Sequence, residues 1–203
     1  QTGVTDFDFD SEGDIENVGK IRTLSMSSLS EQDNNWGVVL MQLQASLPDT
    51  LPGENVTFIF FGDVELVNAV DPSNPNLHPM QAFYLRTGIG DAACAEAPES
   101  GLLIRTPEGQ GELTFSVNGV DVAVGSEVFL QAQPNAMLSG RVFHGSASAS
   151  TQFGKTGAVS GTEFHVPLNG DLLASGPPQP ITSYSHQSVN LPSNIFGEVH
   201  TPL

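Results

Sequence analysis

The chain has 203 residues, of which 38% are hydrophobic, and its 23 acidic and 6 basic side chains give a formal net charge of −17. Nucleic-acid binding requires clusters of lysine and arginine, so this charge excludes nucleic acid as an expected partner and argues against anionic membrane surfaces. No apolar run approaches the roughly 18 residues that a membrane-spanning helix needs, so we expect no membrane insertion.

Residues 1–19 are predicted to form an acidic N-terminal arm, because no basic residue precedes Lys20. Within the arm Thr5, Phe7 and Phe9 alternate with aspartates. Successive side chains of an extended chain point to opposite faces, so the arm would carry aromatic rings on one face and carboxylates on the other.

The same arm holds a candidate calcium site. Its acidic residues resemble the first nine positions of a calcium loop of the EF-hand or dockerin kind: Asp8, Asp10, Glu12 and Asp14. The twelfth position, where a bidentate carboxylate is required, is Gly19. On a strand, same-face acids would lie about 6.6 Å apart, too far for one ion with ligands at about 2.4 Å. Calcium binding and a solvated acidic face both remain open, and we expect no other cofactor.

Residues 20–172 are predicted to form the β domain, and its first half contains several apolar segments with strand patterning. A division into two sub-sheets near 106–111 is left open. The strands are expected within residues 20–29, 36–47, 55–67, 80–87 and 102–106. Residues 58–61 form a continuous apolar run, which is typical of a strand covered on both faces.

The domain is organised around a predicted hairpin at its centre. Leu113, Phe115 and Val117 alternate with polar residues, and a second alternating run begins at Val120. Asn118-Gly119 joins the two runs. A type I′ turn needs positive φ at both central residues, and Asn-Gly is a pair that adopts this conformation readily.

After the hairpin, further strands are expected over 128–130, 138–143 and 162–168, and residues 145–160 form a passage rich in serine, alanine and glycine. Residues 173–203 are rich in proline and are predicted to be a C-terminal arm. No amphipathic helix is expected. We therefore predict an all-β fold, an antiparallel β-sandwich or jelly-roll-like domain with extended N- and C-terminal arms.

Few residues indicate a catalytic, binding or modification site. Lys155 and Thr156 complete a loose phosphate-loop pattern, but a strand follows where that chemistry needs a helix N-terminus, so we predict a turn region without nucleotide binding. Asn55 begins an N-glycosylation acceptor sequence, and Cys94 is the only cysteine, so no disulfide can form within the chain. His144 and His165 lie on predicted strands and could meet across a sheet, although a structural role is the simpler interpretation.

Three segments share a rhythm of glycine turns and strands: Asn-Gly-Val-Asp-Val-Ala-Val-Gly-Ser at 118–126, Val-Phe-His-Gly at 142–145 and Gly-Thr-Glu-Phe-His-Val at 161–166. Residues 119–168, about a quarter of the chain, thereby resemble the FecR-like β repeat of secreted bacterial envelope proteins. The resemblance implies an extracellular β module used for sensing or structure, and it transfers no catalytic residue.

The chain begins at Gln1 without a methionine, and its charges are diluted among serine, threonine, asparagine, glycine and proline. We therefore expect a mature exported product, located outside the cell or on its surface. The leading hypothesis is a non-enzymatic structural subunit that polymerises with itself, as a filament or surface layer, when Thr5, Phe7 and Phe9 of one copy add a strand to another. In the alternatives, the arm folds back onto its own sheet, or the protein is a monomeric module that binds or senses a glycan or calcium.

Overall fold

The structure is a computed structural model that describes residues 11, 13–28, 30, 37–44, 55–70, 80–88, 99–107 and 111–184. These residues form one short 3-10 helix and twelve strands. In chain order the elements are η1 (Val18–Lys20), β1 (Thr23–Ser25), β2 (Val38–Gln44), β3 (Asn55–Phe61), β4 (Val64–Asn68), β5 (Ala82–Thr87), β6 (Gly101–Arg105), β7 (Leu113–Val117), β8 (Val120–Ala132), β9 (Met137–Thr151), β10 (Gly154–Val159), β11 (Thr162–Pro167) and β12 (Thr182–Ser183).

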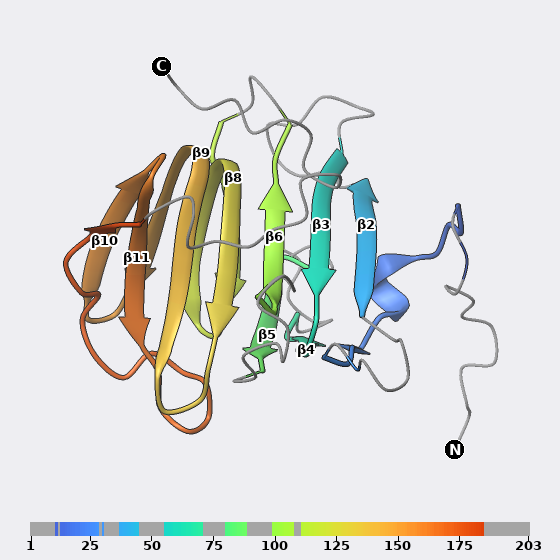
Figure 1. Ribbon diagram of the computed structural model, residues 1–203, viewed down its shortest axis with the longest axis horizontal. Helices are drawn as coiled ribbons and strands as arrows, with labels where there is room; N and C mark the ends of the chain where they lie inside the picture. The colour runs from blue at the N-terminus through green and yellow to red at the C-terminus, as the bar shows by residue number, and fades with distance from the viewer. Residues whose placement is uncertain are drawn as a thin grey trace.

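The strands form two layers that share their two longest members. Figure 1 shows β11, β9, β8, β6, β3 and β2 side by side in front, with β4 and β5 behind. The first half of β8 pairs with β7 and its second half with β6. The two halves of β9 likewise pair with β11 and β10. Strands β8 and β9 therefore pass from one layer into the other as a single ladder.

The ladder bends at a β-bulge opposite Glu127 and Val128 of β8, where β9 contains one extra residue, Phe143. At this corner Ser126 and Gly145 both have positive φ, 131° and 70°. A Cβ atom on Gly145 would lie 1.9 Å from the carbonyl oxygen of Gly125, so a side chain at this position would collide with the neighbouring strand. Bulges bend a strand and increase its twist, which is how one ladder serves both layers.

The predicted central hairpin is confirmed. Val117 pairs with Val120 across a two-residue turn in which Asn118 has φ 55° and Gly119 has φ 70°. The buried side chain of Asn118 donates to the carbonyl oxygen of Leu85 at 2.9 Å and accepts from its N–H at 2.7 Å. The turn is thus fastened to β5 as well as joining β7 to β8.

The main core lies between the two layers and centres on Phe58 of β3. Its ring makes edge-to-face contacts with Phe60, Phe83 and Phe115, with centroids 5.6–6.1 Å apart. These rings come from three strands in both layers, and all four are at most 2% exposed. Loss of one such ring by Phe→Ala substitution typically costs about 3–5 kcal/mol.

A second apolar cluster lies on the opposite face of the front layer. Ile59, Phe61, Leu103 and Phe129 are at most 1% exposed, and Phe143 packs against them. Because residues 58–61 alternate between the main core and this cluster, β3 is covered on both faces, as the continuous apolar run predicts.

The all-β fold class and its sandwich-like arrangement are confirmed. The sheet differs from the purely antiparallel expectation at one place, where β5 and β7 pair in parallel, with Ala82 opposite Ser116. This pairing follows from the chain path, since β6 in the front layer separates the two strands in sequence. Within the described ranges, no helix has the length and apolar character needed to cross a membrane.

Replacing Gly119 by valine is expected to lower the free energy of unfolding by about 1–3 kcal/mol, because a β-branched residue would be forced to positive φ. Chemical denaturation measures the change. Gly157→Val is the matched control: a Cβ there meets nothing closer than the carbonyl oxygen of Ala147 at 3.8 Å, and the residue lies on exposed β10. Equal stability losses in the two variants would refute the turn as the cause.

Candidate functional site

The structure describes only some of the residues that the sequence singles out. Asp14, Asn55, Lys155, Thr156, His144 and His165 are described. The remaining candidates lie outside the described residues: Thr5, Phe7, Phe9, Asp8, Asp10, Glu12 and Cys94. The predicted donor arm and most of the predicted calcium loop therefore stay predictions.

Asp14 closes a local turn. Its Oδ2 atom accepts a hydrogen bond from the N–H of Ser11 at 2.8 Å, and Gly13 between them has φ 93°. Among the described residues, no group of three or more histidine, cysteine, aspartate or glutamate side chains is arranged to hold a metal ion.

Asn55 is the first residue of β3 and pairs with Gln44 at the end of β2. Its Oδ1 atom is buried and has no hydrogen-bond partner. Glycosylation at this position stays a prediction.

The phosphate-loop pattern falls on an ordinary hairpin. Lys155 and Thr156 lie on β10, where they pair with Ser150 and Ala149 of β9. A phosphate loop holds its ligand with backbone N–H groups at a helix N-terminus, and here the chain continues as a strand. The turn itself is limited to residues 152–153, so Lys155 and Thr156 lie on a strand and not in the predicted turn region.

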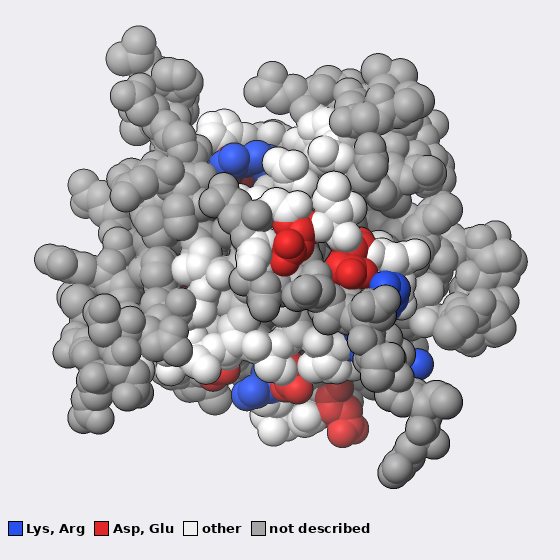
Figure 2. Space-filling model, turned by 90° about the vertical axis from the view of Figure 1, so that its right-hand side faces the viewer, with Lys and Arg blue, Asp and Glu red and all other residues white. Residues whose placement is uncertain are grey.

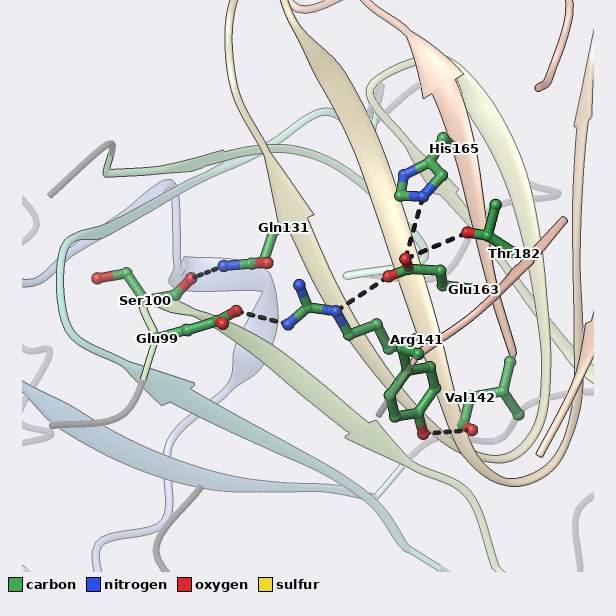
Figure 3. A network of polar contacts seen from close by, with 9 residues as sticks. Glu99, Ser100, Gln131, Arg141, Val142, Glu163, His165 and Thr182 are labelled. Carbon is green, nitrogen blue, oxygen red and sulfur yellow. Dashed lines mark hydrogen bonds and ion pairs between the residues drawn. The ribbon is translucent and has the colours of Figure 1, made fainter. Parts of the chain in front are cut away.

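A polar network on the outer face of the front layer includes the partly buried guanidinium of Arg141 (Figure 3). Its Nε donates to Glu163 on the neighbouring strand β11 at 3.1 Å, and its Nη1 donates to Glu99. Burial alone would lower the pKa of Arg141, but the hydrogen bonds and charges of the two glutamates raise it. Arg141 therefore stays charged and joins β9 to β11 and to the segment that precedes β6.

Glu163 also binds the segment that follows β11. Its Oε1 accepts from the hydroxyl of Thr182 at 3.2 Å and lies 3.4 Å from Nε2 of His165. Tyr184 continues this attachment, donating its hydroxyl to the carbonyl oxygen of Val142 at 2.8 Å. The ring of Tyr184 meets that of Phe143 edge to face at 5.9 Å.

A second group of charges lies at the β-bulge. Glu127 accepts from Nη2 of Arg105 at 2.8 Å and lies 3.0 Å from Nδ1 of His144. The Glu127 side chain is only 10% exposed, so the two neighbours compensate the loss of water around its carboxylate. Each of the two histidines thus has its own glutamate, and they do not form one site.

This constellation is suited to holding strands together. In the described part of the chain, no hydrogen bond joins either histidine to a hydroxyl or thiol nucleophile, and each glutamate already binds cationic or hydroxyl groups. Nucleophilic catalysis requires the base and the nucleophile in hydrogen-bond reach of one another. We interpret the network as structural.

The sheet edges offer a different kind of site. Strand β1 has three residues, and the free side of β11 carries β12 with hydrogen bonds from Ser175 and Gln179 to carbonyl oxygens of β11. Strand β10 presents Lys155, and edge lysines hinder pairing with other chains. By contrast, the seven residues of β2 carry no charge, and in the described residues β2 pairs on one side only, with β3.

Among the described residues, the sandwich is incompletely closed beside β2. We call this side the open flank and define it by partly buried apolar side chains that pack against the main core: Val18, Leu24, Met26, Val39 and Leu43. They come from η1, β1, the residue after β1, and the inner face of β2. On its outer face β2 also exposes Val38 and Leu40, by 38% and 52%. Figure 2 looks onto this side of the molecule, where acidic and basic groups stand among uncharged surface.

Comparisons with known proteins assign no family. No family model and no curated protein matches the chain. Two crystal structures titled as a "putative anti-sigma factor" from Parabacteroides distasonis ATCC 8503 are similar to it, each with a TM-score of 0.47. Their identities are 9% and 10%; the matches cover 82% and 81% of this chain, but only 62% and 61% of theirs. The FecR-like resemblance stays a prediction.

Tyr184 gives a test of whether the segment after β11 is held on the sheet. Burial raises the pKa of Tyr184 to about 12, with Arg141 lowering it and Glu127 and Glu163 raising it to smaller extents. Since the raised pKa belongs to a neutral acid, its stabilising contribution is complete below the ordinary value of about 10 and is lost as pH rises towards 12.

We expect absorbance titration at 295 nm to contain a tyrosine component near pH 12, and Tyr184→Phe to remove it. The variant should also lose about 1 kcal/mol of stability through the missing hydrogen bond to Val142. An unchanged high-pH component in Tyr184→Phe would show that this segment is not attached as described.

Proposed function

We propose that the protein is a non-enzymatic extracellular structural subunit that assembles with copies of itself by strand exchange. In this proposal the N-terminal arm of one copy, residues 4–10, lies along β2 of another copy and covers its open flank. A filament or surface layer built from such units is the corresponding higher assembly.

The open flank is the observation that supports the proposal. Val39 and Leu43 pair with Phe60 and Val56 of β3, so they face the main core, yet they remain partly exposed. Leu24 of the back layer pairs with buried Leu66 and is likewise only partly buried against the main core. A further strand beside β2 would cover these side chains and pair with the backbone edge that no other described strand occupies.

The arm has the pattern that such a strand requires. Thr5, Phe7 and Phe9 share one face and would point between the layers, whereas the aspartates at 6, 8 and 10 would face water. Full burial of a phenylalanine side chain is worth about 1.5–3 kcal/mol relative to exposure. Two such rings, together with main-chain hydrogen bonds, supply affinity that a wholly acidic arm would lack.

The remaining features agree with a structural role outside the cell. The described polar network joins strands to one another through Arg141 and Glu127. A net charge of −17 disfavours close packing of surfaces that are not designed to meet, and keeps assemblies soluble.

The decisive comparison uses two arm variants of the full chain. Replacing Phe7 and Phe9 together by serine should abolish association, because the inward face of the donor strand is lost. Replacing Asp6 and Asp8 by serine changes the same number of neighbouring residues on the outward face and should leave association intact. Light scattering after size-exclusion chromatography measures the mass of each variant, and thermal unfolding checks that both variants fold.

Association that survives in the Phe7→Ser, Phe9→Ser protein would contradict the proposal of strand exchange. A native protein that is monomeric at every concentration would sink the structural-subunit proposal and favour the monomeric module that binds a glycan or calcium.

A further inference from the structure

We infer that the exchange is reciprocal: two copies face each other across a twofold axis, and each inserts its arm into the open flank of the other. The inference rests on the proposed function and specifies its partner and geometry. The closed pair, with two arms and two flanks at one interface, is the unit from which any larger assembly is built.

The position of the arm's root carries the inference. Residues 11 and 13–20 lie on the β2 side of the molecule, opposite β10 and β11 (Figure 1). Val18 belongs to the open flank itself, and Ile21, only 9% exposed, packs into the main core beside it. Lys20 and Glu16 form an ion pair at 3.0 Å across η1, which holds this root in a turn. The attachment point of the donor arm and the acceptor flank therefore lie on the same side of the domain.

In a head-to-tail row of copies that all have the same orientation, each arm would have to cross the width of a domain before it met the next copy's flank. From β2 to β11 the front layer contains five strand spacings, about 24 Å at about 4.8 Å each. Pairing along the seven residues of β2 requires about 23 Å more. Ten fully extended residues span at most about 33–36 Å, so residues 1–10 cannot do both.

When two flanks face each other, the arm no longer has to cross a domain before it pairs. Each arm then begins at the interface and pairs directly with the partner's β2. The same surface serves on both copies, which is the isologous arrangement that closes after two subunits. Growth into a filament or layer would need a second contact elsewhere, because both exchange sites are occupied in the pair.

The average mass measured over a hundredfold range of protein concentration tests the inference. We expect the mass to reach a plateau at that of two chains before any larger species forms, and deletion of residues 1–10 to give a monomer. Mass that grows with concentration without a plateau at two chains, and is lost on deletion, would overturn reciprocal exchange while supporting the proposed function. A two-chain plateau that survives the deletion would overturn the inference, and a monomeric native chain would overturn both.

A distance measurement separates the two geometries independently of mass. Ile15 is 95% exposed at the root of the arm, so Ile15→Cys in a Cys94→Ser background accepts a spin label without disturbing packing. In the reciprocal pair the two labels lie at one interface and should give a single short distance. In a head-to-tail row of copies with the same orientation the labels are separated by the width of a domain, and that result would contradict the inference.

Discussion

The ladder between β8 and β9 is the interaction on which the rest of the structure depends. These strands belong to both layers, so their bend at the bulge beside Glu127 determines how the layers face each other. The extra residue of the bulge is Phe143 of β9, so the buried positions of β9 change there from Leu138 and Val142 to Ala147 and Ala149. Without the bulge, one of these two sets would point to the outer face, because the side-chain period of a strand is two.

The charges on the outer face stabilise this same corner. Glu127 lies at the bulge and binds Arg105 on one neighbouring strand and His144 on the other. Arg141 likewise binds two groups, Glu163 on β11 and Glu99 in the segment before β6. Removing one partner would leave a partly buried charge uncompensated, which costs far more than an exposed pair gains. The network thus fixes the front layer through interactions that would be expensive to break.

Much of the fold could be predicted because alternating apolar residues and an Asn-Gly turn are local signals. Residues 145–160 carried a weaker signal, since the inward positions Ala147 and Ala149 are too small to produce a hydrophobic pattern, although both are buried in β9. The polar network was not predictable. Glu99 and Arg141 are 42 residues apart, and only the register of the sheet brings such charges together. The open flank also required the structure, because a strand's sequence does not reveal whether it lies at an edge.

The length, cover and charge of the edge strands connect the fold to the proposed assembly. Exposed edges invite pairing with other chains, and the described edges other than β2 are short, covered or charged. Strand β2 combines the length, the apolar outer residues Val38 and Leu40 and the absence of charge that these edges avoid, in a chain where acidic residues are otherwise abundant. An edge of this kind persists in a well-behaved protein only if something occupies it. In the proposed exchange the arm, which is attached beside that edge, would fill it, and the acidic face of the arm would remain towards water and supply the charge that discourages further addition.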